Sequence, residues 1–186
     1  MSRGARRPLR RRLARLLPRW WRREEGGAAV EFVLLVPLYI SILLIGVEAG
    51  MMLARQVMLE RAVDIAVRDL RLGSWVNPTH QTLKDRICEH SIMLRNCPSD
   101  LLVELAPVDT ANWELPTDRV ACVDRENEIV PVTQFVPGAG NQLMMVRVCF
   151  IVEPLVPTTG YGLQLPLDAA GGFQLRSAST FVNEPR

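Results

Sequence analysis

A long apolar stretch near the N-terminus constrains this chain more than any other feature. Residues 27–54 contain no lysine or arginine, and their charged side chains are Glu31 and Glu48. A helix needs about 20 predominantly apolar residues to cross a bilayer. The stretch therefore predicts a transmembrane helix over 27–54. A core helix of a soluble protein is the alternative, but it rarely needs an apolar window of this length.

The charge of the chain changes sign where this stretch begins. Residues 1–26 carry ten arginines and two glutamates, a net charge of +8, whereas the rest of the chain carries −6. Lys and Arg are enriched on the cytoplasmic side of membrane helices, so 1–26 is expected to be a basic cytoplasmic leader. Its leucines and Trp20, set between arginines, indicate an interfacial helix that binds anionic lipid. Nucleic acid is the alternative ligand and is not expected for an arm tethered beside a bilayer.

The helical pattern continues beyond the apolar stretch. Over 55–73, apolar residues recur at three- and four-residue spacing and charged residues cover the other faces, which predicts an amphipathic extension of the same helix. Gly73 is the expected stop, so the whole helix is predicted over 28–72. Pro37 lies inside it and lacks a backbone N–H donor, so we expect a kink there.

Residues 74–186 have the pattern of a small α+β domain outside the cytoplasm. The sequence Asn77-Pro78-Thr79 predicts the start of a second helix that ends near Leu94. Runs of alternating or β-branched residues, separated by segments rich in proline and glycine, predict an antiparallel sheet of three or four strands. The predicted strands cover 101–105, 119–123, 143–152 and 173–182.

Four cysteines, Cys88, Cys97, Cys122 and Cys149, all lie after the apolar stretch. An even number of cysteines in an exported domain is typical of disulfides. Three connectivities are open, and one of them joins Cys88 to Cys97 and Cys122 to Cys149. Zinc bound by Cys88, His90 and Cys97 is an alternative, but no CxxC or HxxxH spacing supports it. We expect no metal and no other cofactor.

The sequence does not indicate an enzyme. No nucleophile and base can be paired from it, and no glycine-rich phosphate loop follows a predicted strand. No catalytic residue is therefore predicted.

Glu31 is the most informative residue of the apolar stretch. A carboxylate inside a lipid-embedded helix costs several kcal/mol unless it has a partner, and the intact sequence places no cation near it. Cleavage after Gly26 would create one, because the new α-amine of Gly27 is largely protonated at neutral pH. Between two chains, this amine and the carboxylate would neutralise each other and fix the register of the helices.

The same residues resemble a known family. A basic leader ending in Gly26, a glutamate at the fifth position after it and Phe32 at the sixth are similar to the prepilin-peptidase site of type IV pilin-like proteins. The string Gly-Ala-Ala-Val-Glu-Phe over 27–32, the proline that follows and the closing Phe-Val-Asn-Glu-Pro over 181–185 resemble the TadE-like pseudopilins. These proteins belong to the tight-adherence (Tad, or Flp) pilus systems.

The resemblance implies a pilin-like fold and a role as a minor pilin-like subunit or assembly factor. Gly26 would be the last leader residue, Gly27 the first mature residue, and Glu31 and Phe32 the carboxylate and aromatic of the family motif. The implied partners are a prepilin peptidase, other pilins and the assembly proteins of a bacterial inner membrane, with residues 74–186 in the periplasm. Cleavage after Gly27, a TadF-type relative and incorporation into the fibre remain open.

Two other interpretations of the junction remain. An uncleaved single-pass anchor would present an extracytoplasmic binding or sensing domain. A secretory signal peptide would use the small residues Val47 and Ala49 as its cleavage site, although the apolar region is about twice the usual length.

Overall fold

The computed structural model describes residues 27–113, 118–125, 131, 133–156, 167–168 and 170–185. The chain divides into two compact units, Met1–Leu43 and Leu44–Arg186. Helix α2 (Gly27–Arg71) begins in the first unit and ends in the second. The predicted basic leader over 1–26 lies outside the described residues.

In the first unit, helix α2 exposes large apolar side chains in every direction. Phe32, Leu34 and Tyr39 are 66%, 71% and 68% exposed. A helix that is apolar all round belongs in a protein core or in a membrane. The most apolar 18-residue window of α2 has none of its residues buried within the protein. Its length and composition are therefore those of a membrane span, as predicted.

Helix α2 continues through Pro37. The ring removes one backbone donor, and the hydroxyl of Ser41 donates a hydrogen bond to the carbonyl oxygen of Pro37 at 2.7 Å. The kink expected at Pro37 stays a prediction.

The C-terminal end of α2 is closed by the glycine that the sequence indicated. Gly73 has a positive φ of 64°. Its N–H donates to Leu70 and the N–H of Ser74 donates to Asp69, each at 3.1 Å. This pair of bonds is the Schellman motif, which requires a left-handed residue at the glycine position.

The second helix, α3 (His80–Glu89), is shorter than predicted. Its N-cap is Thr79, whose hydroxyl accepts a hydrogen bond from the N–H of Thr82. The helix ends before the predicted Leu94: the N–H of Ser91 donates to the Cys88 carbonyl at 3.1 Å, and the Ser91 hydroxyl donates to the Ile87 carbonyl at 2.6 Å. The Ser91 hydroxyl thus binds the Ile87 carbonyl oxygen, which would accept the N–H of Ser91 in a longer helix. A short helix, α4 (Cys97–Asp100), follows.

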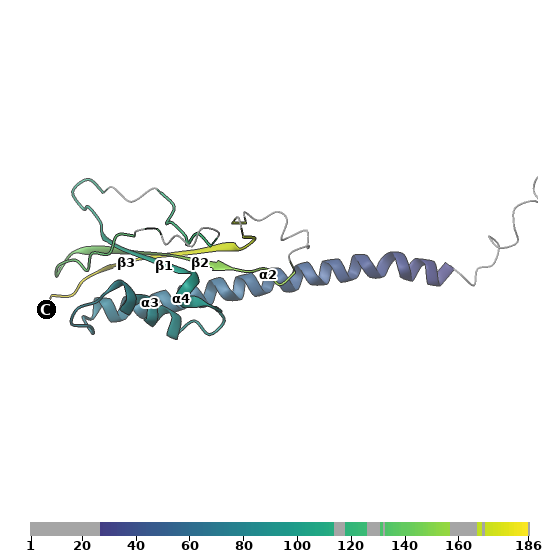
Figure 1. Cartoon of the computed structure of the whole chain (residues 1–186), viewed down its shortest axis with the longest axis horizontal. Coiled ribbons are helices and arrows are strands. Elements are labelled where there is room, and N and C mark those ends of the chain that lie inside the picture. Colours follow the sequence, from purple (N-terminus) through teal and green to yellow (C-terminus); the bar gives the residue numbers. More distant parts are fainter. Residues whose placement is uncertain are drawn as a thin grey trace, which may run out of the picture. The chain divides into compact units, whose positions relative to one another are not determined.

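Three antiparallel strands form one sheet in the order β1-β2-β3. They are β1 (Leu101–Pro107), β2 (Leu143–Val152) and β3 (Phe173–Val182). In the second unit, helices lie on one side of this sheet (Figure 1). Alternate strand residues, including Val103, Val148 and Leu175, join a core with Leu59 and Ile87 from the helices. The predicted α+β class is therefore confirmed.

The predicted strand over 119–123 is wrong. Cys122 is bonded to Cys149, which lies on the central strand β2 on the face turned away from the helices. The disulfide therefore holds the segment against that face of the sheet, and residues 119–123 form no strand. The open edge of β1 is used by another segment, since Leu105 exchanges two backbone hydrogen bonds with Gln134 and Val136 at 2.9 and 2.8 Å.

Candidate functional site

The predicted processing motif straddles the start of the described chain. Gly26 lies outside the described residues, and Gly27 is the first residue of α2. Glu31 and Phe32 are both exposed on the apolar part of the helix. Within the part of the chain that the structure describes, no ion pair involves Glu31. The carboxylate therefore faces outward from a segment suited to a membrane, without a described partner of its own.

Glu48, the second carboxylate of the apolar stretch, has a different environment. Its side chain is 1% exposed. One carboxylate oxygen accepts the N–H of Leu155 and the other accepts the N–H of Val156, both at 3.0 Å. Bonds from backbone N–H groups to a carboxylate are about twice as strong as neutral ones. Glu48 therefore fastens the loop after β2 to helix α2, a role that its sequence position alone did not indicate.

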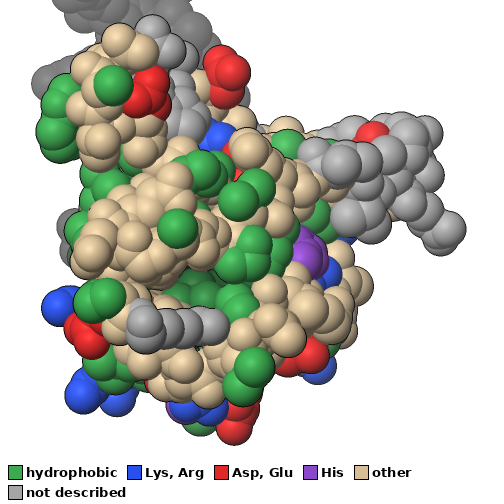
Figure 2. All heavy atoms as spheres, turned by 90° about the vertical axis from the view of Figure 1, so that its left-hand side faces the viewer, with side chains coloured by type: hydrophobic (Ala, Val, Ile, Leu, Met, Phe, Trp, Pro, Cys, Tyr) green, Lys and Arg blue, Asp and Glu red, His purple; other side chains and the backbone are tan. Residues whose placement is uncertain are grey.

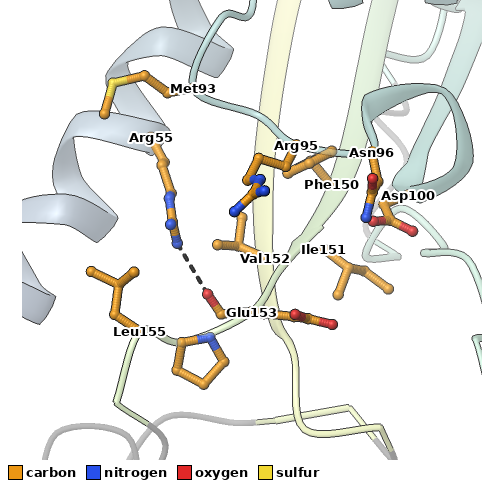
Figure 3. Close-up of a pocket in the computed structure, with 11 residues that line it drawn as sticks. Arg55, Met93, Arg95, Asn96, Asp100, Phe150, Ile151, Val152, Glu153 and Leu155 are labelled. Carbon is orange, nitrogen blue, oxygen red and sulfur yellow. Dashed lines mark hydrogen bonds between the residues drawn. The ribbon is translucent and has the colours of Figure 1, made fainter.

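A second contact holds the same loop to the helix. The Arg55 guanidinium donates to the carbonyl oxygen of Glu153 at 3.0 Å. Figure 3 shows Arg55 and Arg95 reaching into a pocket of about 470 Å³ beside this bond. The Glu153 carboxylate points away from Arg55 and pairs with Arg125 at 3.2 Å. Met52 is also buried, so from Glu48 onward one face of α2 packs against the rest of the second unit.

The transmembrane segment predicted over 27–54 stays a prediction.

The closing sequence motif holds the far end of α2. Phe181 is buried in the core, and the Asn183 amide donates to the carbonyls of Pro137 and Ala139 at 3.0 and 3.1 Å. Glu184 pairs with Arg71 at 3.3 Å. A hollow of about 600 Å³ lies among these segments, and Figure 2 shows hydrophobic side chains within the hollow at this end. These contacts give the Phe-Val-Asn-Glu-Pro motif over 181–185 a structural role.

All four cysteines form disulfides. Cys88 is bonded to Cys97 and Cys122 to Cys149. Both cysteines of the zinc alternative are used in this way, and among the described residues no group of three His, Cys, Asp or Glu side chains is placed to hold a metal. That alternative is therefore wrong. His80, the first residue of α3, has its Nε2 3.0 Å from the carbonyl oxygen of Val103.

The longer disulfide loop should contribute more stability. The Cys122–Cys149 bond closes 27 residues and the Cys88–Cys97 bond closes 9. Chain entropy then gives about 3.5 and about 2.6 kcal/mol. We expect the Cys122→Ala/Cys149→Ala protein to unfold at lower urea concentration than the Cys88→Ala/Cys97→Ala protein, measured by circular dichroism in detergent. Non-reducing peptide mapping of the wild type should find no free thiol. Equal midpoints for the two variants would contradict the entropic ranking.

The comparisons with known proteins agree with the N-terminal motif. Residues 26–68 match the family model of the TadE-like proteins, which confirms the resemblance for this segment. The match covers the residues of the processing motif, the apolar part of α2 and most of its amphipathic part. No curated protein and no solved structure matches the chain.

Proposed function

We propose that this protein is a minor pilin-like subunit, a pseudopilin, needed for assembly of a Tad-type pilus that serves surface adherence. The observation that carries the proposal is Glu31, an exposed carboxylate in an apolar helix whose N-terminal end is Gly27. The TadE-like match over residues 26–68 supports it. The role is structural and interactive rather than enzymatic.

Assembly would use the charges at the start of α2. A prepilin peptidase cuts after Gly26, and the Gly27 amine becomes a cation within the apolar segment. Glu31 pairs with the Gly27 amine of a neighbouring copy, or with the corresponding amine of another pilin or of an inner-membrane assembly protein. Burying either charge alone in a low-dielectric medium has a high free-energy cost, and pairing it with the opposite charge offsets much of that cost. The pair therefore selects a partner and a register, while Phe32 adds apolar contact beside it.

The proposed topology follows from the charge asymmetry. The leader over 1–26 lies on the cytoplasmic side of the inner membrane, where its arginines meet anionic lipid headgroups. The exported domain lies in the periplasm, where disulfides such as Cys88–Cys97 persist. No nucleic-acid partner is proposed.

Processing is the first test of this function. We expect protein extracted from the membrane to begin at Gly27, with a formal net charge of −6 instead of +2. Intact-mass spectrometry measures this directly and separates cleavage after Gly26 from cleavage after Gly27. A Gly26→Leu variant places a bulky residue at the cut and should keep its leader. A wild-type protein that retains the leader would instead support an uncleaved anchor that presents a binding or sensing domain.

A further inference from the structure

Two arginines on the sheet face turned away from the helices have contrasting surroundings. Arg147 on β2 is paired, since its Nη2 donates to both oxygens of Glu104 at 2.8 and 2.7 Å and its Nη1 donates to the carbonyl of Asp118 at 2.8 Å. Arg176 on β3 forms no ion pair with the described residues. Its Nη2 donates to the side chain of Gln174, but its Nε is buried and has no hydrogen-bond partner among the described residues.

Such a group requires an explanation. A buried N–H without an acceptor destabilises the folded protein, and the cost is greater when the group is charged. Burial lowers the pKa of the Arg176 guanidinium, and the positive charge of Arg119 lowers that pKa further. The surroundings of Arg176 thus disfavour the charge that arginine carries in proteins. A counter-charge placed between Arg176 and Arg119 would offset both the burial and the repulsion.

A pocket of about 470 Å³ provides the space for such a counter-charge. Arg119, Arg125 and Arg176 line it, together with Asp124, Asp168 and residues 120–123. The carboxylate of Asp168 is already committed, since Arg125 donates to it at 3.1 and 3.2 Å and the N–H of Gly172 donates at 2.6 Å. The Cys122–Cys149 disulfide fixes one wall directly opposite Arg176 in the strand register.

We propose that this pocket is an oxyanion-binding site in which Arg176 and Arg119 hold a carboxylate or phosphate group. Guanidinium groups present planar N–H pairs that match the oxygens of both anions. The Arg176 guanidinium supplies donors from the wall of the pocket, and Arg119, which is exposed, meets the anion from the solvent side. A free phosphate ion and the side chains of an acidic peptide share this chemistry. The proposal does not depend on the pilus function.

The test uses the full chain in a non-ionic detergent. Inorganic phosphate and triglutamate peptide are titrated separately by isothermal calorimetry, against chloride at equal ionic strength. We expect saturable binding of at least one probe, and the stronger probe identifies the source of the anion. The Arg176→Gln variant should bind at least about tenfold more weakly, because it loses a charge-assisted fork. The Arg119→Gln variant alters an exposed side chain, so it keeps the test valid if Arg176→Gln does not fold.

The matched control is Arg95→Gln, which removes an exposed arginine from the separate pocket beside Arg55. It should leave the affinity unchanged. The proposal is overturned if neither probe binds saturably. It is also overturned if the Arg119→Gln variant retains wild-type affinity, or if Arg95→Gln weakens binding as much as Arg119→Gln does.

Discussion

Replacing Glu31 with alanine should reduce association with pilus components about a hundredfold and largely abolish pilus output. The variant removes the carboxylate that we propose to pair with the Gly27 amine of a neighbouring helix. An unpaired ammonium within an apolar interface costs several kcal/mol. A loss of 2–3 kcal/mol per contact corresponds to roughly a hundredfold in association, since about 1.4 kcal/mol is a factor of ten. Cross-linking or co-purification, with pilus output as the cellular measurement, determines the effect.

In membrane insertion, folding and cleavage, the Glu31→Ala variant should behave like the wild type. Without Glu31 the helix inserts at least as well, because an intramembrane charge has been removed. The exported domain should fold normally, since its core is built from residues of the second unit. Cleavage depends on the small residue Gly26 and should largely survive.

Two further variants separate charge from polarity. Glu31→Asp keeps the carboxylate and should restore part of the assembly. Ser41→Ala removes an uncharged polar group from the same apolar segment and should assemble as the wild type does. If Glu31→Ala protein is made, cleaved and assembled normally, Glu31 is a tolerated residue and the proposed pairing is refuted.

The elements with a strong local pattern could be predicted from the sequence. Helix α2 was expected over 28–72 and spans Gly27–Arg71, because its apolar run and its glycine stop are both local signals. Strands β2 and β3 have the predicted bounds. In β2, alternate residues such as Val146 and Val148 face the core, and this period of two is visible in the sequence.

The errors arose where a contact between distant segments decides the structure. Residues 119–123 have strand-like composition, but the bond from Cys122 to Cys149 holds them against one face of the sheet. The early end of the second helix is a local error instead: there the Ser91 hydroxyl bonds to the Ile87 carbonyl, and apolar periodicity does not report such a bond.

The hydrogen-bond partners of Glu48 could not be predicted from the sequence either. The partners of Glu48 are backbone N–H groups 107 and 108 residues away, and no side-chain pattern marks them. The unpaired Nε of Arg176 was missed for the same reason, since a surface strand with one arginine is unremarkable until its neighbours are known.

Replacing Glu48 with alanine should destabilise the exported domain by about 4 kcal/mol. Each of the two N–H bonds to this carboxylate is charge-assisted, worth about 1.5–3 kcal/mol. With the side chain truncated, the N–H groups of Leu155 and Val156 lose their acceptor at a site where Glu48 is 1% exposed. For a domain of this size, such a loss lowers the melting temperature by roughly 12 °C. Urea unfolding and thermal melts of the full chain in detergent, followed by circular dichroism, measure both quantities.

The graded variant is Glu48→Gln, which keeps one oxygen and places an amide against the second N–H. It should lose about half as much stability as the alanine variant, because one of the two bonds to the loop survives. The matched control is Asp64→Ala, an exposed carboxylate on the same helix, which should change stability by less than about 0.5 kcal/mol. Hydrogen exchange at Leu155 and Val156 should accelerate in the Glu48 variants and not in the control. If the Glu48→Ala and Asp64→Ala proteins have the same melting temperature, the buried carboxylate does not hold the loop to helix α2.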